Sequence, residues 1–162
     1  MLTERKYSSE REEKREAGTV VHFFLENLIH NSFEEREKAF KMTVSKYGAS
    51  FEKENLETIL KGRGIEKFLE DNKIIFSEKW DIIYPEYSIY SEKENKLFRL
   101  DRVMIQKASE KQKGKILVVD YKTGGFEESQ LENYKSLIEQ ELKRINQLEN
   151  YDIEGEYLQI EI

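Results

Sequence analysis

The sequence predicts an α/β protein in which a mixed β-sheet is flanked by helices and preceded by a helical segment. Three observations predict this fold class. Residues 8–71 carry apolar side chains at helical spacing, whereas residues 79–122 are rich in β-branched and aromatic side chains. A helical pattern over residues 127–150 then separates the third strand from a last strand at 157–162. Because a strand–helix–strand connection joins parallel strands, we expect a right-handed crossover and a mixed sheet.

Four helices are predicted in the first half of the chain, at residues 8–31, 32–47, 51–61 and 65–71. Ser8 or Ser9 can cap the first helix. Ser32 and Glu35 form a capping box for the second helix, and Gly48 marks its end. Turn-forming glycines separate the third helix from the fourth.

Three strands are predicted before the long helix, at residues 79–90, 96–106 and 115–122. Pro85 cannot donate to a β-ladder, so we expect it at a bulge or on an edge strand. The polar segment Ser109–Gly114 joins the second and third strands as a hairpin. We therefore expect one domain over residues 1–162, with a mostly helical part at 1–72 and the sheet with its helix at 79–162.

The composition limits the classes of function. The chain has 162 residues, with 27 basic and 33 acidic side chains and a net charge of −6. Because phosphate affinity comes from neutralising cations, a nucleic-acid role needs a local site or a partner. The absence of cysteine excludes iron–sulfur clusters and thiol nucleophiles, and it agrees with a cytoplasmic location. We expect no membrane association, since no apolar stretch approaches the length of a membrane span.

Two carboxylates and a lysine are predicted to converge at the end of the third strand. In an antiparallel pair the residue numbers of cross-strand partners have a constant sum. If Asp101 opposes Asp120, the hairpin turn falls between Glu110 and Lys111, in the most polar stretch of the region. Lys122 shares the face of Asp120 because side chains alternate along a strand. Adjacent carboxylates repel each other unless they bind a divalent cation, so this group suits metal-dependent phosphodiester hydrolysis.

An ordinary structural explanation stands beside this catalytic one. Asp120 and Lys122 can form an ion pair at a strand end, followed by a turn at Thr123–Gly125. An aspartate and a lysine two positions apart are common in proteins, so specificity must come from neighbouring motifs.

Five short stretches supply such motifs, in the order GTVVHFFLE (Gly18–Glu26), YPEYSIY (Tyr84–Tyr90), FRLDRV (Phe98–Val103), VVDYKTGG (Val118–Gly125) and QLENY (Gln130–Tyr134). With these motifs, from Gly18 to its C-terminus, the chain resembles the RecB-like nuclease family. This family is a branch of the PD-(D/E)XK superfamily and forms the nuclease domains of RecBCD- and AddAB-type helicase–nucleases. The resemblance implies a restriction-endonuclease-like core, with a central mixed sheet flanked by helices.

The resemblance also implies roles for the residues of the constellation. Asp101 and Asp120 would hold Mg²⁺ or Mn²⁺, and the backbone carbonyl of Tyr121 would add a ligand. Lys122 would orient or deprotonate the attacking water and stabilise the charge that develops on the phosphate. His22 matches a family histidine that approaches the metal, although without the motif it would be assigned as a core histidine on an apolar helix face.

Four further residues receive supporting roles. Gln130 and Tyr134 lie four apart on one helix face and would position the DNA strand, although Tyr134 also suits helix-to-sheet packing. Glu86 aligns with a family acid that precedes the first catalytic strand and would support or contact the metal, and an exposed strand glutamate is an equal alternative. Arg99 shares the face of Asp101 and could contact phosphate, whereas Arg102 points to the opposite face.

The leading hypothesis is a Mg²⁺- or Mn²⁺-dependent deoxyribonuclease, an exonuclease on single-stranded or unwound DNA ends in DNA repair and recombination. Its implied partner is a helicase domain or subunit, because the chain lacks the phosphate-binding motif of a motor. Two alternatives remain open: a catalytically degenerate nuclease fold that binds DNA ends or scaffolds a helicase complex, and a helical interaction protein with an incidental hairpin. The sequence is compatible with an excised domain of a longer helicase–nuclease or with a stand-alone relative.

Overall fold

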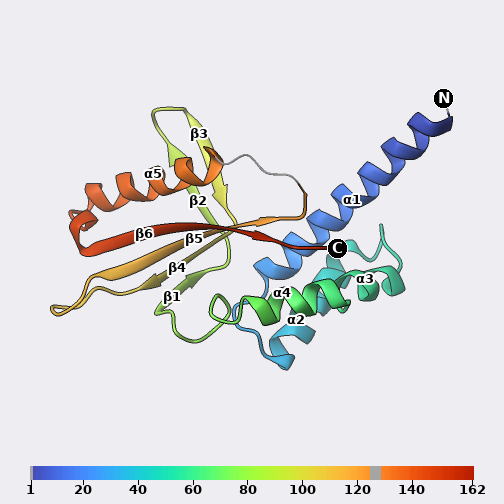
Figure 1. Cartoon of the computed structure of the whole chain (residues 1–162), viewed down its shortest axis with the longest axis horizontal. Helices are drawn as coiled ribbons and strands as arrows, with labels where there is room; N and C mark the ends of the chain where they lie inside the picture. Colours follow the sequence, from blue (N-terminus) through green and yellow to red (C-terminus); the bar gives the residue numbers. More distant parts are fainter. Residues whose placement is uncertain (1, 125–128) are drawn as a thin grey trace. The chain divides into compact units, whose positions relative to one another are not determined.

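The computed structural model describes residues 2–124 and 129–162, with the side chains of residues 2–9 and 129 excepted (Figure 1). The chain forms two compact units. One unit contains the residues up to Lys73 together with Ile160–Ile162, and the other contains Ile74–Gln159. The expected joining of both into one domain stays a prediction.

The first unit is helical. Its elements are α1 (Leu2–Glu26), α2 (Phe33–Tyr47), α3 (Lys53–Leu60) and α4 (Arg63–Asp71). The predicted ends of α2 are confirmed, because Ser32 Oγ accepts from the N–H of Glu35 and Gly48 follows the last helical residue. The predicted capping box is only half formed, since the Glu35 carboxylate does not return a bond to the N–H of Ser32. The Glu35 carboxylate accepts from the N–H of His30, 2.9 Å away, which ties the preceding loop to the start of α2.

The predicted bounds of the first helix are wrong at both ends. α1 already begins at Leu2, six residues before the expected cap at Ser8, and the side chains of Ser8 and Ser9 lie outside those that the structure describes. The helix ends at Glu26, and Ile29 is 41% exposed in the following loop. A continuous charged helical pattern lets α1 extend toward the N-terminus, because charged residues have good helix propensity.

The second unit contains a mixed sheet, as predicted. Its strands are β1 (Ile82–Tyr84), β2 (Tyr87–Ser91), β3 (Lys96–Leu100), β4 (Arg102–Gln106), β5 (Gly114–Lys122) and β6 (Tyr151–Gln159). Four strands form one sheet in the order β1-β4-β5-β6, and β2 and β3 form a separate two-stranded sheet. The β5–β6 pair is parallel, whereas the other pairs are antiparallel. The parallel crossover that the sequence predicts between β5 and the last strand is therefore confirmed.

Two of the predicted strands are each divided in two. The numbers of paired residues sum to 187 both for β1 with β4 and for β2 with β3, so the four strands form one antiparallel ribbon with a common interruption. On one side the interruption contains Pro85, which lacks an N–H, and on the other side it contains Asp101. Pro85 follows β1, an edge strand of its sheet, in agreement with the prediction.

The long helix is shorter than predicted, and the last strand is longer. Helix α5 (Ser129–Arg144) ends six residues before the expected Asn150, and the expected start at Glu127 lies outside the described residues. Asn146 has a φ of 58°, a left-handed conformation that terminates helices and that asparagine tolerates. A short 3₁₀ turn, η1 (Leu148–Asn150), then leads into β6, which pairs with β5 along its whole length from Tyr151.

Helix α5 lies along the sheet of this unit (Figure 1). Its apolar side chains form one buried cluster with apolar side chains of the strands. The buried side chains of α5 are Leu131, Tyr134, Leu137, Ile138 and Leu142, all expected from the helical pattern. Gly155 on β6 allows the close approach, because a Cβ there would lie 2.7 Å from Leu131 Cγ. Ile145 is 54% exposed, since the helix has already ended at that point.

Among the described residues, no helix combines the length and apolarity that crossing a lipid bilayer requires.

Candidate active site

The β4–β5 hairpin brings Asp101 beside Asp120. Arg102 pairs with Val119, so the residue numbers in this hairpin sum to 221, as predicted, and Asp101 and Asp120 occupy the next position of the register. The turn closes between Ser109 and Gln112, which bond to each other through both backbone N–H groups, so Glu110 and Lys111 lie at its centre. The predicted register and turn are confirmed.

A hydrogen bond to the side chain of Asp101 connects this residue to β5. It lies between β3 and β4, at the interruption of the ribbon, where its backbone is not part of either strand. Its Oδ2 accepts from the backbone N–H of Tyr121, 2.9 Å away. This bond directs the carboxylate toward the end of β5, next to Asp120.

The Asp120 carboxylate is almost completely buried, with 4% of the residue exposed. Its Oδ2 lies 3.0 Å from Lys122 Nζ, but no described residue offers this oxygen a well-aligned hydrogen-bond donor. The pKa of Asp120 is raised to about 6, first by burial and then by a hydrogen bond to Asp101 and the Asp101 charge, while Lys122 opposes the shift. A carboxylate in this position gains from any group that brings positive charge.

Lys122 is held from both sides. Besides its ion pair with Asp120, its Nζ donates to Gln130 Oε1 at 2.8 Å, and Gln130 Nε2 donates to the Tyr134 hydroxyl at 2.6 Å. Burial raises the pKa of Tyr134, and the charges of Asp120 and Asp101 raise it as well, so the hydroxyl lies within electrostatic reach of both carboxylates. One continuous chain of polar contacts therefore joins the end of β5 to the first turns of α5.

The predicted residues Glu86 and Arg99 form a pair with each other. Arg99 Nε lies 2.7 Å from Glu86 Oε1, and its Nη2 donates to Oε2 at 3.0 Å. By the register of the ribbon, Glu86 falls opposite Asp101. The Glu86 side chain is 31% exposed and that of Arg99 is 61% exposed, so the pair forms a solvated edge beside the candidate site. A contact of Arg99 with phosphate stays a prediction.

Tyr121 and Arg102 lie on the buried side of the sheet. Burial raises the pKa of the Tyr121 phenol to about 12, an effect that the nearby Arg102 opposes. Arg102 is fully buried, and its guanidinium lies 4.6 Å from the centre of the Phe76 ring while its Nε donates to Met104 Sδ at 3.3 Å. Arg102 therefore points away from Asp101, as strand alternation predicts. Nothing in the sequence pattern indicated that the Arg102 side chain is completely buried.

His22 belongs to the helical unit, in the C-terminal half of α1. Its Nδ1 lies 2.9 Å from the carbonyl oxygen of Gly18, one helical turn earlier, so the G-x-x-x-H spacing produces this contact. A carbonyl oxygen can only accept, so Nδ1 of His22 is the donor in this contact. The role of His22 at a metal stays a prediction.

The carboxylate pair suits Mg²⁺ or Mn²⁺, ions that need few protein ligands, better than it suits an ion that is coordinated by protein side chains alone. In the part of the chain that the structure describes, no three His, Asp or Glu residues gather closely enough to hold a metal ion. Mg²⁺ is usually bound by one or two carboxylates together with water and substrate phosphate oxygens. Asp101 and Asp120 supply such a pair, and the buried Asp120 Oδ2 without an aligned donor is an acceptor that a cation would satisfy.

In comparisons with protein-family models, curated proteins and solved structures, this chain matches none. What the structure itself shows is a mixed α/β arrangement with a carboxylate–lysine site at the end of β5. Both the restriction-endonuclease-like core and the resemblance to RecB-like nucleases stay predictions.

Proposed function

We propose that this protein is a metal-dependent nuclease that hydrolyses DNA phosphodiester bonds at Asp101, Asp120 and Lys122. One observation carries the proposal: two adjacent carboxylates and a lysine meet at a strand end, with Asp120 buried and its pKa raised to about 6. Burying two like charges costs free energy unless a cation or hydrogen bonds offset that cost. Ionisable groups with strongly shifted pKa values are also concentrated at catalytic sites.

Asp101 and Asp120 would hold Mg²⁺ or Mn²⁺, with the Tyr121 carbonyl as a further ligand. When bound, such an ion lowers the pKa of water and offsets negative charge on phosphate oxygens. Lys122 places a positive charge beside the carboxylates, where its N–H groups can orient a water molecule and stabilise charge on the phosphate. The contact to Gln130 keeps this ammonium group in place.

Tyr134 contributes a directed hydroxyl. Its oxygen accepts from Gln130 Nε2, so its own hydrogen is left to donate to another acceptor. In the proposed reaction this acceptor is an oxygen of the DNA backbone. The Glu86–Arg99 pair would extend the phosphate-binding surface at the edge of the site.

The finer assignment, exonuclease action on single-stranded or unwound ends beside a helicase in repair or recombination, rests on the resemblance to RecB-like nucleases. A net charge of −6 supports the need for a partner that delivers the strand. A second candidate is a nuclease fold that binds DNA ends without cleavage. It is favoured by the close Asp120–Lys122 ion pair, which already supplies the carboxylate with a cation.

Digestion of end-labelled single-stranded DNA and of closed circular DNA separates these candidates. Wild type should degrade linear DNA with Mg²⁺ or Mn²⁺ and leave it intact with a chelator. Asp120→Asn should abolish cleavage, whereas the control Asp152→Asn, at an exposed pair with Lys113, should retain it. Cleavage by Asp120→Asn at the wild-type rate would contradict the proposed site, and no cleavage by wild type with either metal would favour the binding module.

A further inference from the structure

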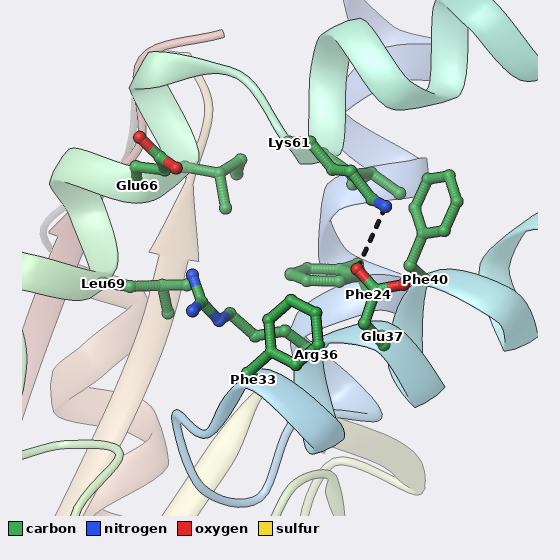
Figure 2. A pocket seen from close by; sticks show the side chains of 10 residues that line it. Phe24, Phe33, Arg36, Glu37, Phe40, Lys61, Glu66 and Leu69 are labelled. Carbon is green, nitrogen blue, oxygen red and sulfur yellow. Dashed lines mark ion pairs between the residues drawn. The ribbon is translucent and has the colours of Figure 1, made fainter.

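Two adjoining hollows of the helical unit form a cleft that the proposed reaction does not use. The first has a volume of about 260 Å³ and the second about 430 Å³, and they share Arg36, Glu66 and Leu69 as lining residues. We call the combined hollow the α2–α4 cleft. Figure 2 shows the first hollow, with Arg36 reaching from α2 toward Leu69 on α4.

One wall of the α2–α4 cleft is aromatic. It contains Phe24 and Phe40, which are 2% and 5% exposed, and Phe33, the first residue of α2. Phe33 is 71% exposed, the highest value among the large apolar side chains that the structure describes. A solvent-facing ring at the edge of a groove is suited to stacking on a flat ligand group.

The other part of the cleft contains buried polar atoms without partners. Arg36 Nε is buried and has no acceptor among the described residues, and Asn31 Oδ1 is buried without a donor. Both residues line the second hollow. Buried polar groups in native proteins are usually satisfied, so a ligand that offers both an acceptor and a donor would complete this site.

Positive charge also accumulates here. Arg36, Arg63 and Lys67 line the second hollow, and within the described chain no carboxylate lies within ion-pair distance of any of them. The two acids of this hollow are Glu66 and Glu70, and Glu70 already pairs with a lysine outside the cleft, at 2.8 Å. A surplus of cations beside an aromatic ring is therefore present in a protein whose net charge is −6.

We infer that the α2–α4 cleft binds a segment of single-stranded nucleic acid, with a base stacked on Phe33 and backbone phosphate on Arg36. A cationic groove that follows the backbone, together with aromatic side chains that stack on bases, is how proteins hold single strands without sequence preference. The exposed Arg63 and Lys67 would add phosphate contacts. The choice of nucleic acid over another polyanion rests on the proposed function.

Fluorescence anisotropy with the full chain tests this assignment, in a chelator so that no cleavage occurs. The probes are a labelled oligo-dT of about 15 nucleotides, a length within the range that single-strand-binding folds occupy, and an abasic strand of the same length. Phe33→Ala should weaken oligo-dT binding at least about fivefold and leave abasic binding unchanged, since one stacked base is lost. Arg36→Gln should weaken both probes, because both carry the phosphate that it contacts.

Two variants on α2 serve as matched controls. Lys41→Gln removes an exposed charge outside the cleft, and Met42→Ala removes a side chain that is 42% exposed. Neither should change binding by more than about twofold. Equal affinities of all four variants for oligo-dT would overturn the inference, and so would an equal effect of Phe33→Ala on both probes.

Cleavage assays keep this inference separate from the proposed function. If Asp120-dependent cleavage occurs and the cleft variants bind like wild type, the cleft inference is wrong and the nuclease proposal stands. If the cleft variants lose oligo-dT binding as expected but no metal supports cleavage, the nuclease proposal fails and the cleft remains a single-strand site.

Discussion

Asp120→Asn should stabilise the metal-free protein at neutral pH. The native carboxyl has a pKa of about 6, against the ordinary value of 3.8, because it is buried beside Asp101. The native state therefore keeps a proton between about pH 4 and pH 6 that the unfolded state has released. The free energy of unfolding must then decrease as the pH rises through this interval, and the asparagine variant lacks this decrease.

The size of the effect follows from the shift. A shift of one pKa unit corresponds to about 1.4 kcal/mol, so a shift from 3.8 to about 6 gives at most about 3 kcal/mol. Because the charges of Asp101 and Lys122 interact with that of Asp120, part of this amount is shared with them, and we expect on the order of 1 to 3 kcal/mol. The loss of the ion pair with Lys122 is already contained in this value, since the lysine opposes the shift.

Urea denaturation of wild type and Asp120→Asn between pH 4.5 and pH 8, with a chelator, measures the difference directly. Groups that do not interact with Asp120 contribute alike to both curves, so the difference between the two curves reports Asp120 together with its neighbour Asp101. The variant should gain stability relative to wild type as the pH rises to about 6, with a constant difference above about pH 7. Parallel curves over the whole range, or a variant less stable than wild type at pH 8, would refute the reasoning.

Three further predictions follow from the same geometry. Binding of Mg²⁺ or Mn²⁺ should strengthen as the pH rises through about 6, because the proton on Asp120 must leave; equal affinities by calorimetry at pH 5 and pH 7.5 would count against the metal site. Gln130→Ala should lower the cleavage rate about tenfold, because Lys122 loses the contact that positions its ammonium group. The control Gln140→Ala, on the exposed face of α5, should cleave like wild type. Equal rates in both variants would show that Gln130 has no positioning role. The isolated chain should bind duplex DNA weakly and with a shallow salt dependence, because its net charge is −6; a steep decrease of affinity with salt in anisotropy titrations would contradict this expectation.

The sequence correctly predicted that Asp101 and Asp120 lie opposite each other, because the turn that sets their register is a local feature of the sequence. A polar turn centred on Glu110 and Lys111 determines the register of a hairpin, and the register determines which side chains are neighbours. Helix α2 was equally predictable, because Ser32 and Gly48 are strong end signals. Helical spacing put Gln130 and Tyr134 on one face of the helix, and the structure shows that this face reaches Lys122 through Gln130.

The errors arose where tertiary pairing overrides local pattern. Acidic residues between Tyr151 and Tyr157 left the first part of β6 out of the predicted strand, but they alternate on the solvent side of a strand that pairs with β5. The interruption at Asp101 was not visible, because it depends on the partner strand containing Pro85. The complete burial of Arg102 could not be predicted either, since it depends on packing against Phe76.

The cleavage rate of Lys122→Met on single-stranded DNA, with saturating Mg²⁺ or Mn²⁺, tests the central claim most directly. Methionine keeps the apolar stem of the side chain and removes the ammonium group that lies 3.0 Å from Asp120 Oδ2. If Lys122 stabilises charge in the reaction, the rate should decrease about a hundredfold or more, while metal affinity by calorimetry is kept and the control Lys115→Met, at an exposed pair with Glu154, cleaves like wild type. A wild-type rate in Lys122→Met would contradict the account and reduce the lysine to half of a strand-end ion pair.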